Sequence, residues 1–287
     1  MTMSRADAVT PGNSGIPGGL SAFIIARNEE ADLPACLESL RGLADEVVVL
    51  LAEDSSDRTG DLAREAGCLV SVRRFDDYAR HKGAALALAT REWALSIDAD
   101  ERATPGLREE ILSVLRSLPA PSGERKTDSP SGTAAPMRPV AYEIPFAVHF
   151  MGRRLAYGGL GSERHLRLFR RDKGRFVGGA LHEGIETDGP VGRLSGDMEH
   201  HPYRDLSEYL EKLDRYTTLS AAKRFAAGQR FRPWHHLILP VEFFVRVVLK
   251  LAFLDGRPGL VWAGLSAFHS WLKYVKLGQL QEKEEKP

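Results

Sequence analysis

The sequence predicts an α/β protein with a mostly parallel sheet flanked by helices, followed by a C-terminal helical region. Two observations predict this fold class. Short apolar runs alternate with helical patterns in the first part of the chain, which is typical of βα units around a parallel sheet. The chain also has 287 residues, enough for one large α/β domain with an ample core and an appended region.

The first elements are four strands and the helices between them. The strands are the apolar runs 21–26, 46–51, 68–72 and the run that ends at Asp98. The helices are expected over 33–43, 57–66 and 82–91. Asp32 is the expected N-cap of the first helix, and Gly67 is expected to end the second.

The later elements are a helix that begins at Pro105, strands over 141–150 and 165–169, and a helix from Asp205 towards Ala227. The first helix has Thr104 before its proline and an apolar stripe on one face. Asp205 and Glu208 have the spacing of a capping box, which predicts the start of the last helix.

These patterns divide the chain into a tail, a main domain and a helical region. Residues 1–19 lack the apolar segment of a signal peptide, so we expect a disordered tail. Residues 20–203 form the main domain. The Pro-, Ser- and Gly-rich stretch 118–139 interrupts it, and we expect a flexible insertion there. Residues 204–287 form the C-terminal helical region.

The composition excludes several classes of protein. Lys plus Arg and Asp plus Glu both number 39, and a net charge of zero argues against a dedicated nucleic-acid binder. The two cysteines, Cys36 and Cys68, have no metal-like spacing, which favours a reduced, cytosolic protein without a disulfide framework.

The most informative stretch is Asp98-Ala99-Asp100-Glu101, because it directly follows a strand-like apolar run. Ligands of open α/β sheets bind beyond the carboxyl ends of the strands. In extended backbone Asp98 and Asp100 would share one face. Two carboxylates there suit Mg²⁺ or Mn²⁺ carrying a substrate diphosphate, whereas a solvated helix-capping turn before Thr104 is the plain alternative.

Seven short motifs follow one another along the chain: Ala26-Arg27-Asn28-Glu29-Glu30, Ser56-Asp57-Arg58-Thr59, Arg80-His81-Lys82-Gly83, Asp98-Ala99-Asp100-Glu101, Arg167-Leu168-Phe169-Arg170-Arg171, Leu181-His182-Glu183 and Phe253-Leu254-Asp255-Gly256. In this order they resemble the motifs of the inverting glycosyltransferases of family 2. The likeness is greatest to the subgroup, β-1,4-glucosyltransferases among them, that adds a hexose to the inner core of bacterial lipopolysaccharide. It extends over residues 20–276, the insertion excepted.

The resemblance implies a GT-A (A-type nucleotide-sugar) fold for residues 20–203 and a metal-dependent, inverting transfer of a hexose, expected to be glucose. The donor would be a nucleotide-diphosphate sugar and the acceptor a lipid-anchored glycan such as the lipopolysaccharide inner core. Glu183 would be the catalytic base, with His182 beside it. The implied donor-binding residues are Arg27, Asn28, Glu30, Glu53, Asp54, Asp57, Lys82 and Asp98. The implied ligands of Mg²⁺ or Mn²⁺ are Asp98, Asp100 and His200.

Several of these side chains also have a purely structural interpretation. Lys82 has the position of a solvated lysine near a helix start, and His182 with Glu183 that of a polar turn. His200 and His201 are equally typical of a pair of surface histidines, and either one is a candidate metal ligand. The arginines of one strand suit an anionic acceptor or a solvated strand edge, and they are Arg164, Arg167, Arg170 and Arg171.

One position departs from the family pattern. The family usually has an Asp that contacts the base where this chain has Ala52. Glu53 or Asp54 would reach the base only after a small shift, so the identity of the donor stays open. The same departure supports an alternative function, a catalytically silent binding module of this fold.

The C-terminal region predicts contact with a membrane surface. The apolar stretch 237–254 carries Glu242, Arg246 and Lys250 at helical spacing, and three charges disfavour a spanning helix. The stretch 259–275 combines aromatic residues with lysines, so we expect an interfacial lobe peripheral to the cytoplasmic face of the inner membrane. The alternative is a buried helical pair. A polyprenyl-phosphate sugar transferase, the second enzymatic alternative, usually has spanning helices.

Overall fold

The computed structural model describes residues 13–118, 138–161, 163–179 and 182–285. These residues divide into two compact units. The first unit runs to Phe146 and resumes over Arg164–His200. The second consists of Ala147–Glu163 and the chain from His201 onwards. The segment 147–163 therefore belongs with the C-terminal helices, whereas we expected it in the main domain.

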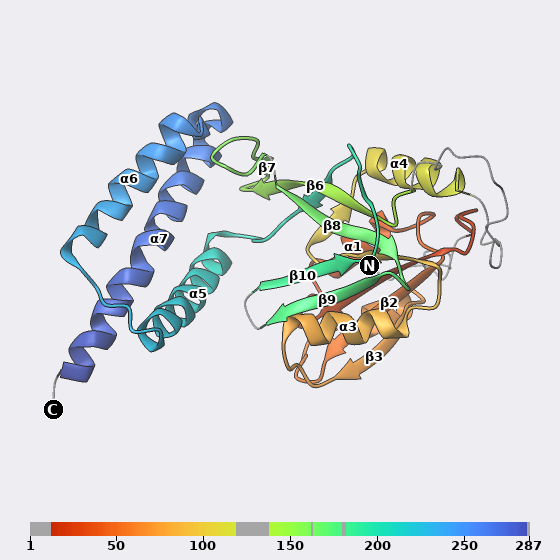
Figure 1. Ribbon diagram of the computed structural model, residues 1–287, viewed down its shortest axis with the longest axis horizontal. Helices are drawn as coiled ribbons and strands as arrows, with labels where there is room; N and C mark the ends of the chain where they lie inside the picture. The colour runs from red at the N-terminus through yellow and green to blue at the C-terminus, as the bar shows by residue number, and fades with distance from the viewer. Residues whose placement is uncertain (1–12, 119–137, 162, 180–181, 286–287) are drawn as a thin grey trace, which may run out of the picture. The chain divides into compact units, whose positions relative to one another are not determined.

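The first unit contains a mixed sheet with the strand order β3-β2-β1-β4-β8-β6-β12-β5 (Figure 1). Its first half is parallel and consists of β1 (Leu20–Ala26), β2 (Glu46–Ala52), β3 (Leu69–Arg73) and β4 (Trp93–Ser96). The other strands are β5 (Glu101–Ala103), β6 (Ala141–Phe150), β8 (Arg164–Arg170), β11 (Val191–Arg193) and β12 (Met198–His200). The pairs β4·β8, β6·β8 and β5·β12 are antiparallel.

The helices of the first unit are α1 (Leu33–Ser39), α2 (Thr59–Glu65), α3 (Tyr78–Leu88) and α4 (Pro105–Arg116). Thr104 caps α4 by accepting a hydrogen bond from the N–H of Leu107, as expected. The predicted cap at Asp32 is wrong, because its backbone is already helical and its side chain makes no capping bond. The helix α3 begins four residues earlier than predicted, since Asp77 caps it.

Two apolar clusters pack on opposite faces of this sheet, because successive side chains of a strand alternate between its faces. Ala22 and Ile24 of β1 join the cluster that includes residues of α1, α2 and α4. Phe23 joins the cluster of α3 and the hairpin of β9 (Gly174–Gly179) and β10 (His182–Thr187). Figure 1 shows this hairpin beside α3. Both cysteines are free.

Residues 13–19, which we expected in a disordered tail, are held to the first unit. Ser14 is 1% exposed, and its N–H and hydroxyl both donate to the carboxylate of Asp45. Arg116 donates from Nε to the carbonyl of Ser14 at 2.8 Å, and Ile16 is buried in the core. Residues 1–12 and 119–137, where most of the expected tail and insertion fall, lie outside the described residues.

The second unit is helical and comprises α5 (Leu206–Ala226), the 3-10 turn η2 (Pro233–Leu237), α6 (Ile238–Phe244), the π-helical turn η3 (Val245–Leu249), the 3-10 turn η4 (Ala252–Asp255), α7 (Gly256–Glu285) and the short strand β7 (Arg153–Arg154). Asp205 caps α5 as predicted by accepting from the N–H of Glu208. In a capping box the side chain of Glu208 would accept from the N–H of Asp205, but here it accepts from the N–H of Arg204. The single helix expected over 237–254 is divided, because Leu251 has a φ of +56° that ends it.

Aromatic rings form the core of the second unit. Trp262 of α7 lies 5.4 Å from Phe150 and 6.2 Å from Tyr209 of α5, measured between ring centroids. Leu265, Phe268 and Leu272 pack against the same cluster. Among the described helices, none has both the length and the hydropathy that crossing a bilayer demands.

We expect Gly196→Ala to destabilise the first unit. A Cβ atom at Gly196 would lie 2.5 Å from Cα and 2.6 Å from the backbone nitrogen of Leu107, so the start of α4 must move. Such overpacking costs about 1–3 kcal/mol in the free energy of unfolding. Chemical denaturation measures the change. Gly106→Ala in the same helix is the matched control, because nothing lies within 4 Å of its added methyl group. Equal stability of the two variants would contradict the prediction.

Candidate active site

The acid-rich segment after β4 forms a tight turn at the carboxyl end of the parallel half of the sheet. The N–H of Glu101 donates to the carbonyl of Asp98 at 3.0 Å, and Ala99 between them is 4% exposed. The extended backbone that we expected for this segment is therefore wrong. Because the turn reverses the chain, Asp98, Asp100 and Glu101 each face a different set of partners.

Asp98 is bound on both carboxylate oxygens by basic side chains. Lys82 Nζ lies 2.9 Å from Oδ1, and Arg167 Nη2 lies 3.1 Å from Oδ2. Lys82 is 3% exposed on α3, so it is not the solvated lysine of the structural interpretation. Burial acts to raise the pKa of Asp98, but the charges of Lys82 and Arg167 outweigh it and hold that pKa well below its usual range.

Glu101 connects the turn to the opposite half of the sheet. Its Oε2 accepts from the N–H of Asp98 at 2.9 Å, and its Oε1 lies 2.6 Å from Nη2 of Arg167 on β8. Burial, with a smaller contribution from Asp98 and Asp100, raises the pKa of Glu101 to about 7. Arg167 therefore holds two carboxylates of one turn in place.

Asp100 has the carboxylate that is available to a metal ion. Its side chain is 25% exposed, and Nε2 of His200 lies 3.4 Å from its Oδ2. The β5·β12 register places His200 opposite Glu101, about 100 residues away in sequence. Burial acts to lower the pKa of His200, but Asp100 raises it above the usual value. One carboxylate and one imidazole at this distance fit a divalent cation such as Mn²⁺ or Mg²⁺, with Asp98 in the same turn.

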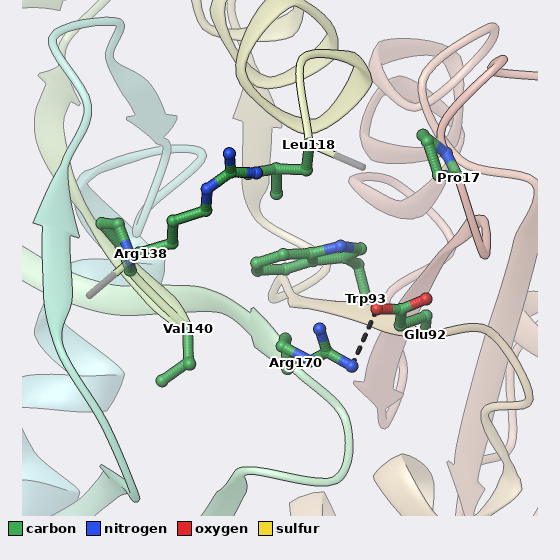
Figure 2. A pocket seen from close by; sticks show the side chains of 8 residues that line it. Pro17, Glu92, Trp93, Leu118, Arg138, Val140 and Arg170 are labelled. Carbon is green, nitrogen blue, oxygen red and sulfur yellow. Dashed lines mark ion pairs between the residues drawn. The ribbon is translucent and has the colours of Figure 1, made fainter. Parts of the chain in front are cut away.

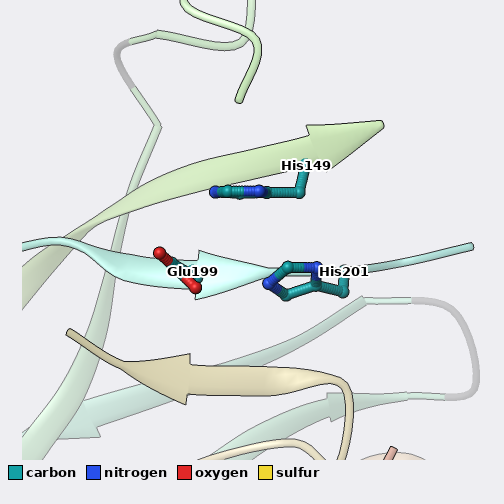
Figure 3. Close-up of side chains that lie close together, drawn as sticks. All are labelled: His149, Glu199 and His201. Atoms are coloured by element: carbon teal, nitrogen blue, oxygen red, sulfur yellow. The ribbon is translucent and has the colours of Figure 1, made fainter. Parts of the chain in front are cut away.

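The two adjacent histidines have different surroundings, which sequence reasoning left open. His200 contacts Asp100 in the first unit. In the second unit, the ring of His201 lies 4.5 Å from that of His149, and the rings are tilted by 33° (Figure 3). His200, not His201, is therefore the histidine that belongs to the acid turn.

The loops after β1 and β2 are joined by hydrogen bonds from predicted donor-binding residues. The Oδ1 atom of Asn28, whose φ is +57°, accepts from the N–H of Ser56 at 2.8 Å. Oδ2 of Asp57 accepts from the N–H of Glu30 at 3.0 Å, and Oε2 of Glu30 accepts from the N–H of Arg58. Burial opposes ionisation of Asp57, but hydrogen bonds from Thr59 lower its pKa. These side chains shape the loops, whether or not they also contact a donor.

Three more predicted donor-binding positions lie around the end of β2. Arg27 and Asp54 form an exposed ion pair with 2.6 Å between Nη2 and Oδ2. Glu53 is exposed, and its N–H donates to the carbonyl of Arg73. Ala52, in place of the usual Asp of the family, is 2% exposed and packs in the interior.

The predicted base lies on the β9–β10 hairpin. Glu183 pairs with Gly178 and His182 with Gly179 in the antiparallel register. The hairpin packs against α3, the helix that carries Lys82. The backbone of the two residues is described, whereas their side chains lie outside the described part of the structure.

Sequence reasoning missed the central roles of Glu101 and Arg167. Arg167 was grouped with three other arginines as a possible acceptor site, and these bind elsewhere in the same unit. Arg164 donates to the carbonyl of Leu194, Arg170 pairs with Glu92, and Arg171 donates to the carbonyl of Arg91. A usable signal in the sequence is that Glu101 is a third acid in the motif, because three acids close together require basic partners.

A separate cavity of about 230 Å³ opens at the other end of β4 (Figure 2). It begins at Trp93, the first residue of that strand, whereas the acid turn follows its last residue. Two of its charged lining residues, Arg170 and Glu92, pair with each other at 2.8 Å, and Arg138 is the third. The cavity is therefore separate from the acid turn.

The buried carboxyl of Glu101 predicts a pH dependence of stability. Its pKa in the folded chain is about 7 and the ordinary value is 4.5, so the folded state binds the proton more tightly than the unfolded state. The resulting stability is complete below pH 4.5 and is lost as the pH rises through about 7. We expect the native chain to lose stability relative to Glu101→Gln over this range. Thermal unfolding with a metal chelator present measures it; parallel curves would contradict the prediction.

Comparisons with known proteins identify the family of the chain. The family model described as glycosyl transferase family 2 matches residues 21–160, a range that includes the acid turn. The chain is 30% identical over 276 residues to the lipopolysaccharide core biosynthesis glycosyltransferase LpsC of Rhizobium meliloti, covering 93% of this chain and 95% of that protein. It is 24% identical to an uncharacterized glycosyltransferase of Rickettsia typhi, covering 92% and 88%.

Among solved structures, the chain is similar to the mannosyltransferase PcManGT of Pyrobaculum calidifontis in complex with GDP-Man and Mn²⁺. The identity is 14%, the TM-score is 0.46, and the match covers 90% of this chain and 86% of that one. The similarity to LpsC over nearly the whole of both chains identifies the class of protein. The chain belongs to glycosyltransferase family 2.

Proposed function

We propose that this chain is a metal-dependent, inverting hexosyltransferase that uses a nucleotide-diphosphate sugar. The observation that carries the proposal is that the acids of the turn have different partners. Asp98 is neutralised by Lys82 and Arg167, while Asp100 and His200 are partly exposed and close together. A turn that only capped a helix would not need a buried lysine and a largely buried arginine.

The charge balance of the turn suits a diphosphate. Three carboxylates alone would repel an anionic donor, but two of them share the positive charges of Lys82 and Arg167. Asp100 and His200 would hold the divalent cation. When bound, this ion supplies Lewis-acid stabilisation of the negative charge on the leaving diphosphate.

In the proposed transfer, Glu183 takes the proton of the acceptor hydroxyl. The acceptor oxygen forms its bond to the anomeric carbon as the bond from that carbon to the diphosphate breaks, and the configuration inverts. One carboxylate suffices, because no covalent sugar intermediate forms. The position of Glu183 on a hairpin beside α3 supports this role.

The proposed acceptor is a lipid-anchored glycan such as the lipopolysaccharide inner core. This part of the proposal is supported by the similarity to LpsC, a lipopolysaccharide core biosynthesis glycosyltransferase, over nearly the whole of both chains. We propose glucose as the sugar and the cytoplasmic face of the inner membrane as the place of the reaction. Ala52 packs in the interior where the family usually has a base-contacting Asp, so the base of the donor is to be identified by experiment.

A panel of radiolabelled nucleotide sugars, incubated with Mn²⁺ and lipopolysaccharide core acceptors, tests the proposal. We expect transfer, or slow donor hydrolysis, from one member of the panel. Mass spectrometry of the product distinguishes a core glycan from a polyprenyl-phosphate sugar. Binding of a nucleotide sugar without turnover by any donor would instead establish the silent binding module and overturn the proposal.

The proposed roles of Asp100 and Glu183 predict opposite effects in two variants. Asp100→Ala removes a metal ligand, so Mn²⁺-dependent donor binding should weaken at least about tenfold. Glu183→Gln keeps the binding site but cannot take a proton, so turnover should fall by about 10²–10⁴-fold while donor affinity is retained. Calorimetry and initial rates measure the two effects.

The matched control is Glu186→Gln on the same strand, β10. Glu186 lies three residues after the predicted base. It is exposed and pairs with Arg175 at 2.8 Å. It should leave both turnover and donor affinity unchanged. Loss of donor binding in Glu183→Gln alone, with turnover per bound donor retained, would show that the assigned roles are wrong.

A further inference from the structure

The second unit exposes an apolar face along η2, α6 and η3. Five large apolar side chains there have exposed fractions between 56% and 67%, and they are Trp234, Leu237, Val241, Phe244 and Leu249. The first four recur at intervals of three or four residues, so they lie on one face of the helix. Single exposed apolar residues are common in proteins, but a continuous stripe of this kind marks an interaction surface.

The polarity of this helix is inverted relative to a helix that faces water. Arg246, which is 20% exposed, pairs with Glu242 at 3.4 Å and donates from Nη1 to the carbonyl of Gly158 in the same unit. Arg246 therefore packs against the protein, whereas the large apolar residues of the helix face outwards. A water-facing helix buries its apolar stripe instead, because each buried methylene stabilises the fold by about 0.8 kcal/mol.

The turn after this helix also exposes large apolar side chains. Phe253 and Leu254 of η4 are both about half exposed. They precede Asp255, whose carboxylate accepts from the N–H groups of Ala156 and Tyr157 and so holds the turn to the body of the unit. The exposed apolar residues thus lie on a fixed part of the second unit.

The charges around this face are suited to anionic headgroups. In the segment 230–260, all of which is described, the exposed charged residues are the basic Arg232, Lys250 and Arg257. Its two acids, Glu242 and Asp255, are partly buried and make the contacts given above. Exposed apolar residues with basic residues around them are the pattern of a protein that lies on an anionic bilayer.

The aromatic residues of α7 do not contribute to this surface, although we expected them to. Trp262 and Phe268 pack in the core of the second unit, and Trp271 donates from its indole N–H to His236. The outward-facing residues of the helical pair therefore come chiefly from η2, α6, η3 and η4.

We propose that this face, defined by Trp234, Leu237, Val241, Phe244 and Leu249 together with Phe253 and Leu254, docks the protein on an anionic lipid bilayer without crossing it. The apolar side chains enter the headgroup boundary, and Arg232, Lys250 and Arg257 contact lipid phosphates. The inference is independent of the proposed transfer, because lipid binding requires neither donor sugar nor turnover.

Vesicle flotation of the full chain tests the proposal, with phosphatidylcholine vesicles compared with vesicles of phosphatidylcholine mixed with phosphatidylglycerol. We expect binding to the anionic vesicles and a fall of at least about tenfold in their partition coefficient for the double variant Leu237→Ser, Phe244→Ser. A blue shift of tryptophan emission on binding, absent in Trp234→Phe, would place this face at the lipid.

The matched control is the double variant Leu210→Ser, Leu219→Ser, which removes two apolar side chains of similar exposure from α5 of the same unit. It should bind vesicles as the native chain does, and circular dichroism checks that both double variants fold. Equal binding by both double variants, or no binding by the native chain, overturns the proposal. So does a lipid-free dimer, detected by light scattering, that Leu237→Ser, Phe244→Ser dissociates, because the face would then join two copies of the chain.

Discussion

The site depends on one electrostatic constraint, the need to hold several carboxylates together in a largely buried turn. Asp98 and Glu101 share the guanidinium of Arg167, and Asp98 also pairs with the buried Lys82. A buried charge without a partner would cost several kcal/mol, so these pairs are a condition for folding. Asp100 is not part of them and has His200 beside it, which is why we propose Asp100 as the ligand of the cation.

The architecture brings these partners together from distant parts of the sequence. The turn follows a strand of the parallel half, Lys82 comes from a helix that precedes it, and Arg167 and His200 come from β8 and β12. The antiparallel half of the sheet thus supplies Arg167 and His200, which contact the acids at the end of the parallel half. The second unit follows a different rule, because Arg246 of η3 packs inwards while large apolar side chains of α6 and η3 face outwards.

Local pattern predicted much of the fold. The apolar runs marked β1 to β4 to within two residues at each end, and Thr104 and Asp205 cap the helices that their spacing predicted. The errors occur where local preference and tertiary contacts differ. The segment 13–19 has the composition of a tail, yet Ser14 is held by Asp45. The local sequence near residue 251 does not predict the positive φ of Leu251, which divides the helix expected over 237–254.

For the candidate site, the sequence by itself determined which chemical groups are present: an acid triplet after a strand, a lysine in a helix and a histidine before the C-terminal region. Only the tertiary structure decided which of them pair. In the sequence Arg167 is one of four similar arginines and Glu101 is one acid among three, and only the folded sheet brings Nη2 of Arg167 to 2.6 Å from Oε1 of Glu101. The physical reason is range: hydrophobic periodicity acts over a few residues, whereas a buried ion pair joins whichever charges the completed sheet brings within about 3 Å.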